Sequence, residues 1–493
     1  MAFNFKDRIN DYFRDYDDLR INRIFNEIAD LKKVSGQYDS SDFQNNLFKK
    51  NVELKKALES REMKMVIERN KDKLLDNEFF YISFSQIIVL FVIKHLKNSN
   101  DQILETAVNE GLKEIGFNQV EAISLATLFT SGQRRMRKSD VDQERMQKLF
   151  SRFALIRDKI LAIKGKEILQ NYGDCIRQYG TPFPSAETRK EIKLNGRWLA
   201  KIVDRYMQLC SDKYKYFVIE CFKNPQELYY FREKYSYFYL IALSAPHDNR
   251  LRWTGVSKEE YYKVEKRERG LCDEDHVNSF DFIHLDVARC IDIADIAIVN
   301  NSNIDELFHK LLRYTALILE PGSLKPTESE TLMQMAYTLS VKSNCLSRQV
   351  GAVITNADGY VIGAGWNDVG EGQLSCGIKM GQDYCNEYLK NDDIKIIPEE
   401  YKYYLCIKEK YKEGKQKKSL CPVLHAEENA ILQIAMHGSG SIKDGTIYST
   451  TVKLFVEQNI KSLKMNIFEG VKSYSYFKLF KSYYDKKELQ KLF

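Results

Sequence analysis

The sequence predicts an α/β protein in which a mostly helical N-terminal region precedes two α/β domains. Only 8 prolines and 24 glycines occur among its 493 residues, which favours long helices with few flexible linkers. In residues 1–75, apolar side chains recur at three- and four-residue spacing, as in amphipathic helices. From about residue 210 onward, short apolar runs alternate with helical stretches, and this alternation is typical of α/β folds.

Length and charge limit the classes of function. A chain of 493 residues is too long for one hydrophobic core, and we expect two or three domains. The net charge of +6 is weak for this length. It is compatible with anionic ligands such as nucleotides, and it does not indicate nucleic-acid binding.

The N-terminus and the cysteines predict a cytoplasmic protein. Residues 1–7 lead directly into charged residues and form no cleavable signal. The 10 cysteines are scattered without regular spacing, as expected for reduced thiols. The apolar run Phe79–Ile93 is shorter than the roughly 20 residues that span a membrane. It therefore predicts a buried strand or a core helix, and no membrane partner.

Residues 1–165 form the first expected region, which is mostly helical and to which the sequence assigns no function. Its first helices, within residues 1–75, are either a partner-binding arm or a helical cap on the following domain, and we favour the cap. The basic cluster Arg134–Lys138 is interpreted as a solvated turn rather than as a phosphate contact.

The second expected domain, residues 166–326, carries α/β patterns. Tyr216–Glu220 reads as a short buried strand, a loop then opens a helix near Pro225, and Phe238–Leu243 reads as a second strand. Strand, helix and strand at this spacing predict a parallel βαβ unit. Residues 287–298 read as a helix running into a strand that closes the same sheet.

This second domain resembles a P-loop kinase-like fold. Together with residues 171–182, it is similar to the kinase-like half of bacterial antiphage deoxycytidylate deaminases, in which such a domain precedes the deaminase. A phosphate loop of the form G-x-x-x-x-G-K-[S/T] would hold phosphates with backbone amides and a lysine. The sequence contains no such motif, so the domain is interpreted as degenerate and we expect no ATP hydrolysis.

The third expected domain, residues 327–493, follows a stretch of proline and glycine at residues 321–327 and is predicted to be an α/β/α sandwich. The expected elements are a helix at 330–342, a buried strand at 350–354, a hairpin turn at 356–359, a strand at 361–368, a helix opening at 425 and a strand at 445–450.

His425 and Glu427 open the last of these helices with the chemistry of a zinc nucleobase deaminase. An imidazole can hold a metal while a carboxylate two residues later moves protons, which is the first half of the H-x-E…P-C-x-x-C signature. With Ser347–Ile354 and Gly365–Asp368, the motif makes residues 327–451 similar to the deoxycytidylate deaminase family.

The resemblance implies a role for each motif residue. His425 would be a zinc ligand, and Glu427 would protonate N3 of cytosine and assist the departure of ammonia. Asn367 would hydrogen-bond the sugar, and Arg348 would lie near the nucleotide phosphate. From the residues alone, Asn367 can also be a turn residue and Arg348 a partner in a surface salt bridge.

The second half of the zinc signature is missing from the sequence. Where the family has Pro-Cys-x-x-Cys, Thr451 runs into Val452, and the last cysteine is Cys421. A catalytic zinc needs three protein ligands and an open position for water. Cys376, Cys385 and Cys421 are the candidates to replace the missing thiolates, and the alternative is that they bind no metal.

The resemblance implies two functions. The first is zinc-dependent hydrolytic deamination of deoxycytidine nucleotides, from dCMP or dCTP to dUMP or dUTP, in antiphage nucleotide depletion. The second is that of a catalytically inactive homologue, in which an internal deletion after Thr451 has removed the cysteine pair, and which acts as a nucleotide-binding or regulatory protein. A homo-oligomer is expected in both cases, with the aromatic residues 474–484 as an interface or as a core-covering helix.

Overall fold

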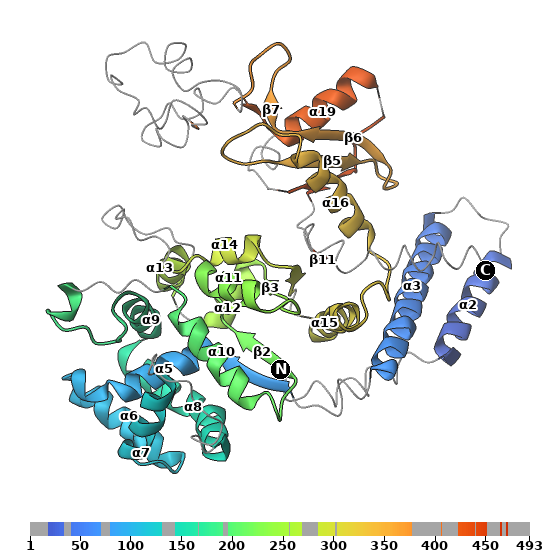
Figure 1. Cartoon of the computed structure of the whole chain (residues 1–493). Coiled ribbons are helices and arrows are strands. Elements are labelled where there is room, and N and C mark those ends of the chain that lie inside the picture. Colours follow the sequence, from blue (N-terminus) through green and yellow to red (C-terminus); the bar gives the residue numbers. More distant parts are fainter. Residues whose placement is uncertain are drawn as a thin grey trace, which may run out of the picture. The chain divides into compact units, whose positions relative to one another are not determined.

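The structure is a computed structural model of the chain (Figure 1). The chain divides into two compact units, residues 1–294 with 300–319 and residues 295–299 with 320–493, and each is described by itself. The residues described are 18–33, 41–70, 79–130, 143–268 apart from 166, 191–195 and 256, 284–376 apart from 301–302, 406, 423–450 apart from 439, 464–465 and 470–471.

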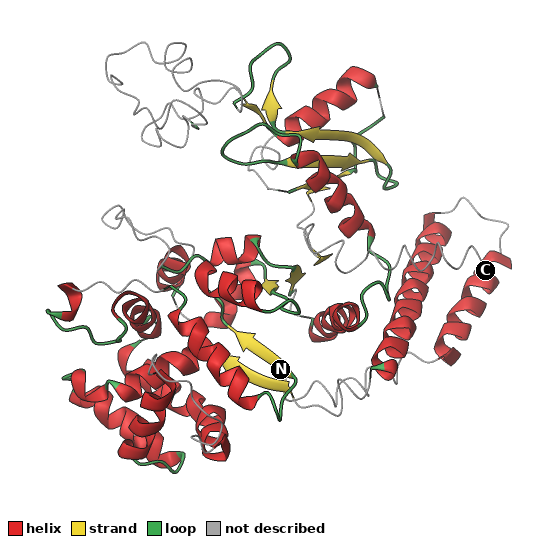
Figure 2. Ribbon diagram, viewed as in Figure 1, coloured by secondary structure: helices red, strands yellow, loops and turns green. Residues whose placement is uncertain are grey.

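Helices dominate the first unit (Figure 2). Its helices are α2 (Asp18–Lys33), α3 (Ser41–Arg69), α5 (Phe84–Lys94), α6 (Gln102–Glu114), α7 (Gln119–Thr130), α8 (Gln143–Lys164), α9 (Ile168–Tyr179), α10 (Trp198–Cys210), α11 (Pro225–Lys234), α12 (His247–Thr254), α13 (Lys258–Glu268), α14 (Val287–Asp292) and α15 (Ile304–Leu319). Two short 3-10 helices are η2 (Leu96–Asn98) and η4 (Thr188–Lys190), and the strands are β1 (Phe79–Ser83), β2 (Tyr216–Glu220) and β3 (Ile241–Ser244).

The core of the first unit surrounds α5. Every residue from Ile87 to Ile93 is buried, and the surrounding helices contribute apolar side chains such as Phe153 and Tyr206. Ser83 ends β1 and also caps α5, and its backbone N–H donates to Gln86 Oε1 at 2.9 Å. The apolar run at residues 79–93 therefore contains both a strand and a core helix, which the sequence left as alternatives.

Among the described residues, no helix is both long enough and apolar enough to span a bilayer.

Strand pairing in the first unit differs from the prediction. β2 pairs in parallel with β1, and the two strands form a two-stranded sheet. The expected parallel βαβ unit, formed by β2, α11 and the strand after α11, is wrong for the described strands, because β2 and β3 lie in different sheets. The strand after α11 also begins later than predicted, because Phe238, expected to begin it, stacks on Phe231 at a ring separation of 5.8 Å and lies edge-on to Phe222. The strand begins only at Ile241.

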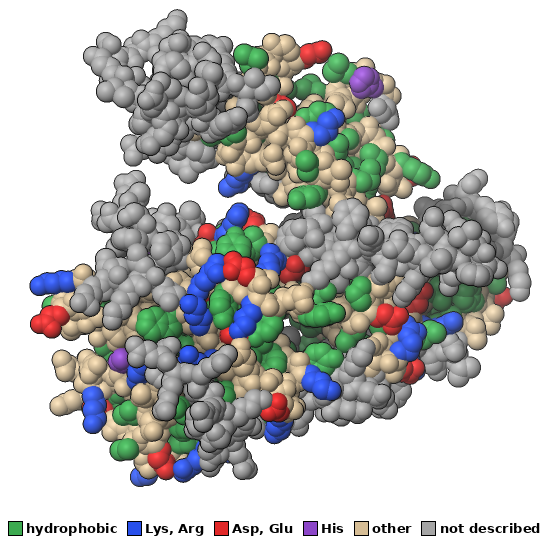
Figure 3. All heavy atoms as spheres, viewed as in Figure 1, with side chains coloured by type: hydrophobic (Ala, Val, Ile, Leu, Met, Phe, Trp, Pro, Cys, Tyr) green, Lys and Arg blue, Asp and Glu red, His purple; other side chains and the backbone are tan. Residues whose placement is uncertain are grey.

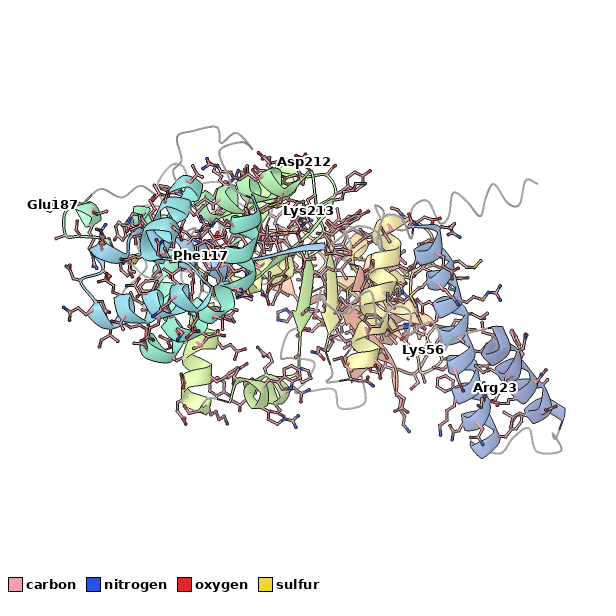
Figure 4. All side chains as sticks on the ribbon, turned by 90° about the horizontal axis from the view of Figure 1, so that it is seen from below. Arg23, Lys56, Phe117, Glu187, Asp212 and Lys213 are labelled. Carbon is pink, nitrogen blue, oxygen red and sulfur yellow. The ribbon has the colours of Figure 1, made fainter. Side chains whose placement is uncertain are left out.

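The N-terminal helices are anchored to α15. Arg313 Nε donates to Glu59 Oε1 of α3 at 2.7 Å, and His309 Nε2 lies 3.7 Å from Glu59 Oε2. Burial raises the pKa of Glu59, but the nearby His309 and Arg313 outweigh burial, so the pKa lies below its usual value. Lys56, labelled on α3 in Figure 4, places further positive charge beside Glu306 of α15.

A buried ion pair joins α9 to α11. Arg177 Nε donates to Glu227 Oε1 at 2.8 Å, and Arg177 Nη1 donates to Asp174 Oδ1 at 3.1 Å. Burial raises the pKa of Glu227, and the neighbouring guanidinium of Arg177 opposes that rise. Because both partners are almost inaccessible to solvent, loss of either side chain would leave an uncompensated charge in the core.

Charged side chains of both signs are interspersed on the visible face of the first unit (Figure 3). Neighbouring helices share exposed ion pairs, such as Arg197 Nη1 with Glu233 Oε2 at 2.6 Å and Arg145 Nη2 with Glu121 Oε1 at 3.0 Å. Exposed pairs of this kind contribute little to stability. The mixed distribution is consistent with the weak net charge of +6.

The second unit is a three-layer α/β/α sandwich. Its sheet has the strand order β10-β9-β5-β6, in which β5 is antiparallel to both neighbours and β10 is parallel to β9. Its elements are β4 (Ile296–Val299), α16 (Glu328–Ser340), β5 (Gly351–Thr355), β6 (Val361–Trp366), β7 (Asp368–Val369), β8 (Val423–Leu424), α19 (Ala426–His437), β9 (Thr446–Ser449), β10 (Lys464–Met465) and β11 (Gly470–Val471). Two antiparallel pairs, β7 with β8 and β11 with β4, complete it.

The two faces of β5 explain the layers. Ala352 and Ile354 contact α19, whereas Val353 contacts α16 and Tyr448 of β9. Since successive side chains of a strand point to opposite faces, this alternation puts one helix on each side of the sheet. Figure 1 shows α16 and α19 on opposite sides of β5 and β6. The hairpin turn is also as predicted, with Gly359 at φ +87°.

The substitution Gly351→Ala tests the packing of α16 against β5. A Cβ at Gly351 would lie 1.9 Å from the carbonyl oxygen of Ala336 in α16, so Gly351→Ala must push α16 away from β5. We expect a loss of about 3 kcal/mol in the free energy of unfolding. Gly370→Ala is the control, because a Cβ there meets nothing within 4 Å. Urea unfolding should separate the two variants, and equal stabilities would contradict the described α16–β5 contact.

His95 is expected to make the first unit less stable in mild acid. Burial, together with the positive charge of the adjacent Lys94, lowers the pKa of His95 to about 4. Between pH 6.5 and 4 the unfolded chain binds a proton that the folded chain does not, so stability falls as the pH falls. Because the ring is only half-buried, we expect His95→Leu to reduce the stability difference between pH 7 and pH 5 by about 1 kcal/mol.

The measurement for His95 is the change in melting temperature between pH 7 and pH 5. His437→Leu, at an exposed histidine of α19, is the control and should keep the pH dependence of the unaltered chain. If His95→Leu also keeps it, the histidine does not carry the effect.

Candidate functional site

One end of the sheet in the second unit gathers the sequence motifs. At the N-terminal end of β5, Gly351 pairs with Trp366 of β6, and Ala352 pairs with Ser449 of β9. Asn367, which follows β6, therefore lies at the same edge of the sheet as the C-terminal end of β9.

Helix α19 begins at this edge. His425 precedes the helix with extended backbone angles, φ −71° and ψ 151°, and its backbone N–H donates to Glu428 Oε2 at 2.9 Å. Asn429 Nδ2 donates to the carbonyl oxygen of Trp366 at 3.0 Å, which ties the first turn of the helix to the end of β6. His425 and Glu427 are thereby brought to the edge where Asn367 lies.

Two glycines of β6 let α19 approach the sheet closely. A Cβ at Gly365 would lie 2.5 Å from the backbone nitrogen of Ala430 and 2.6 Å from the carbonyl oxygen of Ala426. A Cβ at Gly363 would lie 2.6 Å from Ile434 Cδ1. The helix therefore rests on bare strand backbone, which fixes its height and register above the sheet. Sequence reasoning assigned no role to these glycines.

Glu427 is held by a residue that sequence reasoning missed. Ser449 Oγ donates to Glu427 Oε1 at 2.9 Å, and the two side chains are 9% and 4% exposed. The end of β9 is fixed in turn, because Thr450 N donates to the carbonyl of Gly351 at 3.1 Å and Gly351 N donates to Thr450 Oγ1 at 3.2 Å. The one available signal was that Ser449 closes the strand preceding the expected cysteine pair.

The side-chain amide of Asn367 holds the loop before β5. Its Oδ1 accepts from the backbone N–H of Val350 at 2.6 Å, and its Nδ2 donates to the carbonyl of Arg348 at 2.8 Å. The backbone carbonyl of Asn367 accepts from Ser343 Oγ at 2.6 Å. A carboxamide has two N–H donors and two acceptor lone pairs, and within the described ranges these bonds use one donor and one acceptor of the Asn367 side chain.

Arg348 is exposed at the same loop, with its backbone fixed by Asn367 and its side chain directed to the surface. A second cation, Lys342, lies 3.9 Å from the centre of the Trp366 ring. This is close contact for a cation over an aromatic face and holds the ammonium near the end of β6. Lys342 was not singled out from the sequence.

The described residues do not form a zinc site. Within the described ranges, no three histidine, cysteine, aspartate or glutamate side chains lie close enough together to hold a metal. His425 is a single imidazole, whereas a catalytic zinc needs three protein ligands. Of the candidate substitutes, Cys376 is half-buried, while Cys385 and Cys421 lie outside the described residues.

The comparison with protein families locates the match in the second unit. Residues 326–452 match the family described as the cytidine and deoxycytidylate deaminase zinc-binding region. A solved structure, the apo dCMP deaminase from the cyanophage S-TIM5, is 24% identical, covers 26% of this chain and 67% of its own, and has a TM-score of 0.16.

Two curated relatives are deoxycytidylate deaminases. The protein from Schizosaccharomyces pombe is 30% identical over 150 residues, which are 30% of this chain and only 38% of that protein. The protein from Enterobacteria phage T4 is 31% identical over 154 residues, which are 28% of this chain and 76% of that protein. Because the match spans most of the phage protein, the chain belongs to the deoxycytidylate deaminase family.

Proposed function

We propose that the second unit binds deoxycytidine nucleotides at the edge of the sheet where α19 begins. The observation that supports this most is the buried carboxylate of Glu427, which Ser449 holds at the helix N-terminus beside His425. A carboxylate accepts hydrogen bonds, so it suits the amino group of cytosine and repels the carbonyl that uracil has in its place. Asn367 would bind the sugar, and Arg348 with Lys342 would neutralise phosphate charge.

Hydrolytic deamination of the bound nucleotide, dCMP or dCTP to dUMP or dUTP, is the second candidate function. Water replaces the amino group at C4, the C–N bond breaks, ammonia leaves and a carbonyl forms. The carboxyl of Glu427 is the group that can accept a proton from water and return it to the base. The buried position of this carboxyl favours the candidate, and the single imidazole of His425 among the described residues speaks against it.

For the first unit we propose a degenerate kinase-like domain that does not hydrolyse ATP, with a helical region before it. The direct passage of β1 into α5 at Ser83 supports the absence of ATP hydrolysis, since it leaves no room between this strand and this helix for a phosphate loop. Antiphage nucleotide depletion is the setting that the resemblance suggests. Nucleotide depletion requires deamination, so this role fails if the chain does not deaminate deoxycytidine nucleotides.

Zinc content distinguishes the two candidate functions. We expect well below one zinc per purified chain and no change in His425→Ala, because one histidine cannot hold a catalytic zinc. Metal analysis of both proteins gives the answer. About one zinc per chain that disappears with His425 would show that other residues complete the site. An assay of dCMP and dCTP deamination would then decide whether the enzyme turns over.

Nucleotide binding tests the first candidate. We expect the chain to bind dCMP or dCTP more tightly than the matching uracil nucleotide, and Glu427→Gln to reduce that preference about tenfold, because it removes a charged acceptor. Calorimetric titration measures both affinities. Glu428→Gln is the matched control, since an amide oxygen can still accept from the backbone N–H of His425. Equal affinity of the unaltered chain for cytosine and uracil nucleotides would contradict the proposal.

A further inference from the structure

We propose that Ser449 is a positioning residue that orients Glu427 and so sets the preference of the site for cytosine over uracil. The inference rests on the proposed binding of deoxycytidine nucleotides. It adds to that function a determinant of specificity outside the three sequence motifs. Ser449 acts through Glu427 rather than by contact with the reacting atoms.

The first support is the rigidity of the donor. Ser449 is the last residue of β9, and its backbone is held in the ladder opposite Ala352 of the central strand β5. The next residue, Thr450, exchanges hydrogen bonds with Gly351 through both its backbone and its hydroxyl. A hydroxyl mounted on a strand fixed at this point cannot follow Glu427 if that side chain moves.

The second support is the rigidity of the acceptor's helix. The backbone of α19 rests directly on Gly363 and Gly365 of β6, and Asn429 ties the first turn to the carbonyl of Trp366. The Glu427 side chain can still rotate about its own bonds. The 2.9 Å bond from Ser449 Oγ to Glu427 Oε1 removes that freedom.

The third support is the chemistry of the two carboxylate oxygens. Within the described part of the chain, Oε1 is the oxygen engaged by Ser449, which leaves Oε2 to accept from a ligand. A carboxylate oxygen accepts hydrogen bonds and does not donate them. An acceptor at Oε2 attracts the amino group of cytosine and repels the carbonyl of uracil. Loss of the serine hydroxyl would let the carboxylate turn away and would weaken this discrimination.

Ser449→Thr and Ser449→Val test the proposal as a matched pair. The two substitutions add nearly the same volume to a β-strand, and only threonine keeps the hydroxyl. The measured quantity is the ratio of the dUMP and dCMP dissociation constants, from calorimetric titration of the full chain. We expect Ser449→Thr to keep the ratio of the unaltered chain and Ser449→Val to lower it about tenfold. The double variant Ser449→Val with Glu427→Gln should have the same ratio of dissociation constants as Glu427→Gln alone, because both changes act through the same carboxylate.

The controls separate the inference from the function on which it rests. Melting temperatures show whether each variant folds, and Ser449→Ala replaces Ser449→Val if valine does not fit. If the unaltered chain binds no deoxycytidine nucleotide, or Glu427→Gln changes nothing, the proposed function fails and this inference with it. If Glu427→Gln lowers the ratio while the variants without the hydroxyl match Ser449→Thr, only the positioning role of Ser449 is overturned.

Discussion

The close contact between the backbones of α19 and β6 is the constraint on which the candidate site depends. Only a residue without a Cβ fits at positions 363 and 365, where an added atom would meet the helix at 2.5 to 2.6 Å. An α-helix turns by about 100° per residue, so a shift of one residue along this contact would turn Glu427 away from β9. The glycines therefore decide which helical side chain meets Ser449.

Strand β5 transmits this constraint to the rest of the edge. It is clamped on its other face by α16, whose Ala336 carbonyl lies where a Cβ of Gly351 would be. Through its ladder it sets both the end of β6, with Trp366 before Asn367, and the end of β9 at Ser449. The strands that hold the site are therefore packed against a helix on each face of the sheet. Asn367 also fixes the loop before β5 through its hydrogen bond from Val350.

Local sequence patterns were enough to predict the sandwich, but they could not predict contacts between residues distant in the sequence. The hairpin turn at Gly359 and the apolar runs of β5 and β6 are signals contained in a few residues, and the motif at His425 named the family. The pairing of β1 with β2 joins residues 79–83 to residues 216–220, and no local pattern specifies such a partner. Ser449 could not be singled out, since its role exists only where β9 meets α19. Strand propensity at Phe238 was likewise overridden by a tertiary contact, the stacking of its ring on Phe231 of α11.

A buried carboxylate needs a compensating donor or charge, and this requirement links Ser449 to the missing ligands. Glu427 is 4% exposed, and leaving its charge unpaired would cost several kcal/mol. In a deaminase with a complete ligand set, metal charge beside the carboxylate helps to meet this requirement. Among the described residues here, the hydroxyl of Ser449 is the group that donates to the Glu427 side chain. A hydroxyl stabilises and orients the carboxylate but does not activate water.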